Sequence, residues 1–132
     1  MLVNLAGHVP VGLAVASPVF SVPALHDLPA VQKAPYLDAV AAVNPNGTAL
    51  SLVVTNRHPD SPLTAEVVLH DFTPRPAVAT STLAGDSPTA HNSFEQPEAV
   101  RTVKGDARAG KNGLRYTFPP LSLTLLTFRL SR

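Results

Sequence analysis

The sequence predicts an all-β fold: an antiparallel β-sandwich of two sheets, with about eight strands and little or no helix. Fourteen prolines and seven glycines interrupt the chain, and proline is strongly disfavoured inside helices. Between these breaks, apolar and polar residues alternate repeatedly, as they do in half-buried strands. The pattern does not separate an immunoglobulin-like topology from a jelly roll.

Length and composition fit one domain over residues 1–132, with no need for a stabilising cross-link. The absence of cysteine excludes disulfides and thiolate metal sites. The absence of cysteine does not decide the compartment of the protein. We expect a cytoplasmic location in preference to a secreted one. A net charge of +1, with 14% charged residues, argues against nucleic acid and anionic membranes as partners. No run of about 18 apolar residues predicts a membrane span.

The N-terminal third begins with an apolar segment, Met1–Ala24, which has prolines and no basic residue near its start. We therefore expect it to enter the domain and not to act as a signal peptide. Within it, Val11–Val22 is predicted as a strand. Pro23–Pro35 follows as an exposed, proline-rich loop, and Tyr36–Val43 is predicted as the next strand, ending at the turn Asn44–Gly47.

Two clear alternating runs follow, Ala49–Asn56 and Leu63–Leu69, separated by the polar loop Asn56–Pro62. With Tyr36–Val43 they are expected to form a three-stranded antiparallel meander. The middle run has the most regular alternation, with Leu50, Leu52 and Val54 on one face.

Weaker strands are predicted farther along, at Ala77–Leu83, Ala99–Lys104 and Leu114–Phe118. Between them lie Gly85–Pro97, a long segment without periodicity, and Gly105–Gly113, a flexible loop. Loops as long as the first are uncommon in compact domains. We therefore expect Gly85–Pro97 to be functional or packed against another structure.

The last strand, Leu121–Leu130, is expected to be the most buried one, entered through Pro119 and Pro120. Its apolar positions change phase between Leu125 and Leu126. Two interpretations remain open: a β-bulge at that point, or a strand covered on both faces.

Motifs for catalysis are weak. The best carboxylate pair, Glu95 and Glu98, lies on one loop, where two groups seldom face each other across a glycosidic bond. The five histidines lack metal-ligand spacing, and no nucleophile elbow, Walker loop or dinucleotide fingerprint occurs. We expect no metal and no cofactor. Asn56-Arg57-His58 is interpreted as a hydrogen-bonding loop, with Arg57 as its functional member because it can bind a partner carboxylate.

The segment 90–100 holds the most informative loop residues. Asn92 and Ser93 can hold a turn, and Phe94 is a large apolar residue among polar ones. We expect Phe94 to anchor the loop to the core beneath it, or alternatively to contact a neighbouring domain. A small sugar-stacking platform of Tyr36, Phe94 and Tyr116 is a further possibility, although core or interface roles are favoured for these rings.

Five short motifs stand in an order that resembles the C-terminal domain of the α-L-arabinofuranosidases of glycoside hydrolase family 51. They are Pro35-Tyr36-Leu37-Asp38-Ala39, Val54-Thr55-Asn56-Arg57-His58-Pro59, Leu83-Ala84-Gly85-Asp86, Asn92-Ser93-Phe94-Glu95-Gln96-Pro97-Glu98-Ala99-Val100 and Pro119-Pro120-Leu121-Ser122-Leu123-Thr124-Leu125-Leu126. Ser17-Pro18-Val19-Phe20 is similar to that domain's entry. The resemblance covers nearly the whole chain from about Val11.

The resemblance implies a jelly-roll sandwich packed beside a (β/α)₈ barrel, which carries the general acid/base and nucleophile Glu of a retaining mechanism. This sequence has no eightfold βα alternation, so neither catalytic Glu has a counterpart here. Glu66, Glu95 and Glu98 therefore receive no such role, and the chain alone is expected to be inactive. Its expected partner is the barrel, in cis or in trans, which hydrolyses terminal arabinofuranosyl residues of arabinan and arabinoxylan.

As candidate residues for contact with the barrel or another ligand we take Tyr36, Arg57, Asn92, Phe94 and Glu95. An exposed apolar patch is expected around Tyr36, Phe94 and the segment Val11–Phe20, through which the chain can also self-associate. Two other functions stay open, a free-standing carbohydrate-binding module and an independent enzyme of unknown reaction.

Overall fold

The computed structural model of the chain describes residues 5–132, in which all strands pair antiparallel and no α-helix occurs. The strands are β1 (Val9–Pro10), β2 (Val19–Val22), β3 (Val31–Pro35), β4 (Leu37–Val43), β5 (Ala49–Asn56), β6 (Leu63–Val68), β7 (Ala77–Gly85), β8 (Val100–Arg108), β9 (Gly113–Phe118) and β10 (Ser122–Arg129). The predicted all-β class is confirmed. Met1–Asn4, the start of the predicted entry segment, lie outside the described residues.

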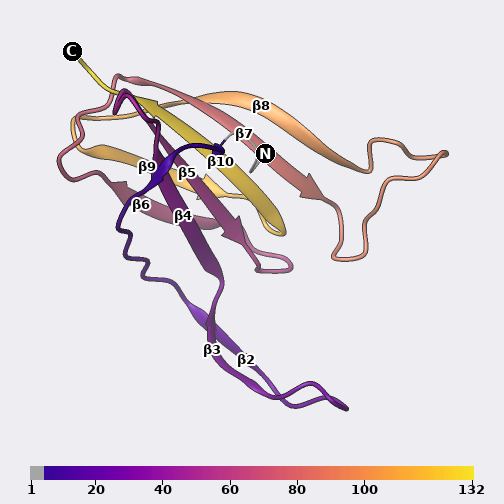
Figure 1. Ribbon diagram of the computed structural model, residues 1–132. Coiled ribbons are helices and arrows are strands. Elements are labelled where there is room, and N and C mark those ends of the chain that lie inside the picture. Colours follow the sequence, from indigo (N-terminus) through magenta and orange to yellow (C-terminus); the bar gives the residue numbers. More distant parts are fainter. Residues whose placement is uncertain (1–4) are drawn as a thin grey trace.

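A six-stranded sheet in the order β1-β4-β5-β10-β7-β8 forms one layer, and the β6–β9 pair forms the other (Figure 1). The core lies between them. Leu52, Leu126 and Phe128 of the larger sheet belong to one buried cluster with Leu114 and Phe118 of β9. Phe118 and Phe128 are fully buried, and burying such a side chain stabilises a fold by about 1.5–3 kcal/mol.

The last strand, β10, lies in the middle of the six-stranded sheet, between β5 and β7. Its register runs unbroken against β5 and against β7, so no bulge occurs at the phase change. Leu125 and Leu126 point to opposite faces and are 8% and 0% exposed. The phase change therefore reflects a strand covered on both faces.

The predicted meander is wrong in its third strand. β6 does not pair with β5; it pairs with β9, from Leu63 against Phe118 to Val68 against Gly113. The loop after Asn56 carries the chain across to the second sheet. An alternating pattern fixes which face of a strand is buried but not which strand lies beside it. The paired residues here, from Leu63 with Phe118 to Val68 with Gly113, are 55 to 45 positions apart in the sequence.

Two other predicted boundaries are corrected. Only Val19–Val22 of the predicted strand Val11–Val22 forms a strand, and it pairs with Val31–Pro35, which was predicted to be loop. The predicted strand Ala99–Lys104 continues to Arg108, so the flexible loop is shorter. Gly105, within this strand, lies opposite Thr80. A Cβ added to Gly105 would lie 3.0 Å from Thr80 Oγ1. This glycine permits close packing and does not end the strand.

Two extensions project from the sandwich (Figure 1). The first, called the arm, is residues 18–35 with β2 and β3; the second is the β7–β8 loop, residues 86–99. Both leave from the same end of the six-stranded sheet, because Leu37 lies opposite Asn56, Asn56 opposite Ser122, and Ser122 opposite Ala84. They point in different directions, the arm downward and the loop sideways in Figure 1.

Candidate functional site

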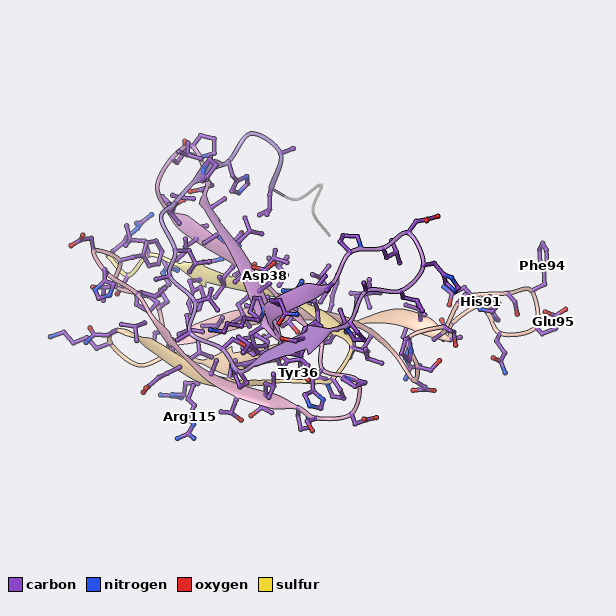
Figure 2. All side chains as sticks on the ribbon, turned by 90° about the horizontal axis from the view of Figure 1, so that it is seen from below. Tyr36, Asp38, His91, Phe94, Glu95 and Arg115 are labelled. Carbon is purple, nitrogen blue, oxygen red and sulfur yellow. The ribbon has the colours of Figure 1, made fainter. Side chains whose placement is uncertain are left out.

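The five candidate residues fall into two groups. Tyr36 and Arg57 lie where the arm joins the sandwich, whereas Asn92, Phe94 and Glu95 lie on the β7–β8 loop. Figure 2 shows Phe94 and Glu95 at the far end of that loop, well separated from Tyr36 in the body of the domain. The structure therefore offers two surfaces and not one site.

At the base of the arm, three aromatic rings form a column. The Tyr36 ring centroid is 4.7 Å from that of Phe20 in β2 and 4.6 Å from that of His58 in the loop after β5. Two backbone hydrogen bonds lie beside this column. The Tyr36 amide donates to the Pro18 carbonyl (2.9 Å), and the Arg57 amide donates to the Tyr36 carbonyl (2.8 Å). The column, which the sequence did not reveal, attaches the arm to the body.

The loop after β5 is hydrogen-bonded, as predicted. Asn56, 1% exposed, donates from Nδ2 to the carbonyls of Ser61 (3.2 Å) and Phe118 (3.0 Å), and its Oδ1 accepts from the His58 amide (2.9 Å). His58 Nδ1 accepts from the amides of Asp60 (3.2 Å) and Ser61 (2.9 Å). Because Nδ1 is an acceptor, the neutral ring carries its hydrogen on Nε2.

Beside this loop, Arg57 approaches the Asp38 carboxylate, with 3.8 Å between Nη2 and Oδ2. The side chains are 40% and 65% exposed, so this contact is screened by water and contributes little. That Arg57 binds a carboxylate of a partner stays a prediction.

The β7–β8 loop is internally ordered. Asn92 binds Val100 twice, with Nδ2 donating to its carbonyl (2.9 Å) and Oδ1 accepting from its amide (2.7 Å). At the tip, the Ser93 amide donates to the Gln96 carbonyl (3.1 Å), and the Gln96 amide donates to Ser93 Oγ (3.1 Å). Phe94, at this turn, is fully exposed (103%). The expectation that it anchors the loop to the core beneath is therefore wrong.

An open hollow of about 460 Å³ lies at the root of the same loop. Arg57 is the charged residue in its lining. We call it the root hollow and define it by its main lining residues, Arg57, Leu83, Ala90, Val100, Leu121 and Leu123. It is mostly apolar, with one cation in its lining.

Glycosidase chemistry finds no support in Glu95 and Glu98. Glu98 lies near Arg101 (3.9 Å), and both side chains are largely exposed. The pKa of Glu95 is lowered, first by its own backbone amide and then by the Ser93 hydroxyl. A general acid needs a raised pKa, which burial provides and this loop tip does not.

Residues 5–132 give no support for a metal site or for a membrane-spanning helix. No group of three or more His, Asp or Glu side chains there is placed to hold a metal ion. Within the same residues, no helix is long and apolar enough to cross a membrane.

The proposed aromatic platform does not form. Tyr36 stacks on Phe20 and His58, Tyr116 stacks on Phe118 with ring centroids 5.0 Å apart, and Phe94 lies alone at the loop tip. Stacking on a sugar needs rings that share one exposed surface. These three lie apart, so this basis for a carbohydrate-binding module is absent.

Several of the similar solved structures are arabinofuranosidases. The α-L-arabinofuranosidase of Thermotoga maritima superposes with a TM-score of 0.83 and 23% identity, over 92% of this chain and 26% of that one. The enzyme of Thermotoga petrophila superposes with a TM-score of 0.80 and 23% identity, over 89% of this chain and 25% of that one. A family 51 α-L-arabinofuranosidase of Bifidobacterium longum superposes with a TM-score of 0.66 and 24% identity, over 88% of this chain and 22% of that one. The chain thus spans about a quarter of these proteins.

No curated protein matches the sequence. A family model, however, described as the α-L-arabinofuranosidase C-terminal domain, matches residues 4–122. This match covers most of the chain, and the fold of the similar structures agrees with it. The chain therefore belongs to the family of α-L-arabinofuranosidase C-terminal domains.

Proposed function

We propose that this chain is a non-catalytic domain that packs against a (β/α)₈ barrel and holds it in place, the barrel being the part that hydrolyses terminal arabinofuranosyl residues of arabinan and arabinoxylan. The support is that the chain matches a C-terminal domain and spans about a quarter of the similar enzymes. The remaining three quarters of those proteins leave room for such a barrel.

The observation that carries the proposal is the arm. Five large apolar side chains on it are exposed, and three more are exposed on the segment 11–17 that leads into it. They are Val19, Val22, Leu25, Leu28 and Val31, with Val11, Leu13 and Val15. An isolated two-stranded hairpin is marginally stable in water, and contiguous apolar surface marks an interaction site. The arm thus has the composition of a segment that is completed by a larger partner.

The experiment uses a separately produced barrel of a family 51 α-L-arabinofuranosidase. We expect the chain to bind it in isothermal titration calorimetry, and the pair Leu25→Ser and Leu28→Ser to weaken binding by about tenfold or more, because two apolar anchors are lost. Val68→Ser on β6 is the matched control, since Val68 is 56% exposed but lies outside the arm. It should bind as the wild type does.

Two results would contradict the proposal. The first is wild-type affinity in the Leu25→Ser, Leu28→Ser variant. The second is release of arabinose from an aryl arabinofuranoside by the chain alone, which would favour an independent enzyme. Retention on an arabinoxylan gel that depends on Tyr36 or Tyr116 would instead favour the alternative of a carbohydrate-binding module.

A further inference from the structure

We propose that two copies of this chain associate by exchanging their β7–β8 loops, with Phe94 and Glu95 of each copy docked into the root hollow of the other. The inference goes beyond the contact with the barrel, which depends on the arm. The features that support it are the exposed tip of the β7–β8 loop, with Phe94 and Glu95, and the root hollow at the base of the same loop.

The tip is built to present an aromatic side chain. Phe94 is fully exposed, yet the turn that carries it is closed by two hydrogen bonds between Ser93 and Gln96. Below it, Asn92 and Val100 hold the two sides of the loop together. Docking an ordered loop costs less conformational entropy than docking a flexible one. A rigid, exposed aromatic residue is the usual anchor of a binding interface.

The root hollow matches the tip in chemistry. Leu83, Leu121 and Leu123 supply apolar walls for the Phe94 ring, and the volume of about 460 Å³ exceeds the need of one side chain. Glu95 follows Phe94 directly and is a carboxylate, whereas Arg57 is the charged residue in the lining of the hollow. The present ion pair of Arg57 is long and exposed, so it yields readily to a closer carboxylate.

Symmetry makes the exchange mutual. Phe94 and Glu95 lie at the tip of the β7–β8 loop, away from the body of the domain (Figure 2). The root hollow lies at the root of the same loop, so the tip of one copy does not reach the hollow of that copy. When two copies lie side by side in opposite directions, a two-fold axis across the middle of the loops places each tip at the root of the other. Such an isologous contact closes on itself as a dimer.

The test is the oligomeric state of the chain, measured by sedimentation equilibrium over a concentration series. Wild type should dimerise reversibly. Phe94→Ala and Arg57→Glu should each raise the dimer dissociation constant by about tenfold or more, because one loses the anchor and the other repels Glu95. The double variant Arg57→Glu, Glu95→Arg should restore dimerisation, because the charges are reversed together.

Leu25→Ser is the matched control, because Leu25 is an exposed apolar residue (62%) on the arm. It should dimerise as the wild type does. Circular dichroism melting curves verify that each variant is folded. The proposal is overturned if wild type stays monomeric at every concentration, if the charge reversal fails to restore the dimer, or if Leu25→Ser abolishes it. Barrel binding is a separate assay with other variants, so either proposal can fail alone.

Discussion

The rings of Tyr36 and His58 stack with their centroids 4.6 Å apart, joining the residue between β3 and β4 to the loop after β5. Phe20 continues the column into the arm. The direction of the arm is therefore set by the sandwich, through side chains and through the backbone bonds of Tyr36. An arm held in this way presents its apolar residues in one orientation.

Tyr36→Ala should loosen the arm. Aromatic pairs contribute about 0.5–1.5 kcal/mol each, so losing two of them should open the arm about tenfold more often. Trypsin measures this opening, because it cleaves after Lys and Arg and Lys33 is the one such residue of the arm. Cleavage after Lys33 should accelerate by that factor. Phe94→Ala also removes an aromatic ring, but at a distance, and should leave the rate unchanged. Equal rates in the two variants would refute the anchoring role.

His58→Ala should destabilise the domain. The amides of Asp60 and Ser61 both donate to His58 Nδ1, and one of them is part-buried, so they lose their acceptor. We expect a loss of about 1–3 kcal/mol in the free energy of unfolding, measured in urea. His91→Ala is the control, because its ring contacts only the Thr89 carbonyl (3.1 Å) in an exposed loop. The hypothesis does not survive if both variants unfold at the same urea concentration.

Asn56→Asp tests the corner between the two sheets. Asn56 donates two hydrogen bonds to carbonyl oxygens, and a carboxylate at this buried position would face both oxygens without a donor. We expect a loss of about 2–4 kcal/mol. Asn112→Asp, at an exposed position, makes the same chemical change and should alter the unfolding free energy by less than about 0.5 kcal/mol. A similar loss in both would show that the corner bonds are dispensable.

The strands that the sequence predicted well are those whose burial is visible locally. Ala49–Asn56 and Leu121–Leu130 are both internal strands with buried residues on both faces. The first still alternates, with Leu50, Leu52 and Val54 in the core cluster, and the second is apolar on both sides of Leu125 and Leu126. The sequence does not predict the partner of Leu63–Val68, because pairing between residues 45 to 55 positions apart leaves no mark in a two-residue period. Topology is the part that local patterns do not contain.

The arm and the column were missed for a related reason. Val31–Pro35 is a strand exposed on most of its length, so it lacks the alternation that burial imposes, and the prolines of the segment Pro23–Pro35 favour a loop. Phe20 and His58 contact Tyr36 only in the folded chain. By contrast, an isolated Phe94 among polar residues is unusual, and it marks the β7–β8 loop in the sequence. Its full exposure, however, depends on a turn geometry that composition does not reveal.

Gly113→Ala should disrupt the β6–β9 sheet. Gly113 has φ of 136°, which side-chain-bearing residues rarely adopt, and an added Cβ would lie 1.8 Å from the Val67 carbonyl oxygen. The atoms that the added Cβ meets are backbone atoms of Val67 and Val68, which cannot rotate away, so we expect a loss of more than about 3 kcal/mol, seen as a lower melting temperature. Gly12→Ala meets nothing within 4 Å and should leave the melting temperature nearly unchanged. Equal melting temperatures would contradict the strain.

Ser93→Ala should raise the pKa of Glu95. That pKa is lowered chiefly by the backbone amide of Glu95 and secondly by the Ser93 hydroxyl, so removing the hydroxyl leaves a smaller shift. Since the folded-state pKa is depressed, the contacts of the ionised carboxylate are present above the ordinary pKa and are lost as the pH falls through the lowered one. Carboxyl carbon shifts in NMR titrations report this directly. Ser87→Ala, in the same loop but bonded to Thr89 (3.3 Å), is the control. An unchanged Glu95 titration in Ser93→Ala would mean that the hydroxyl takes no part in holding the charge at the tip.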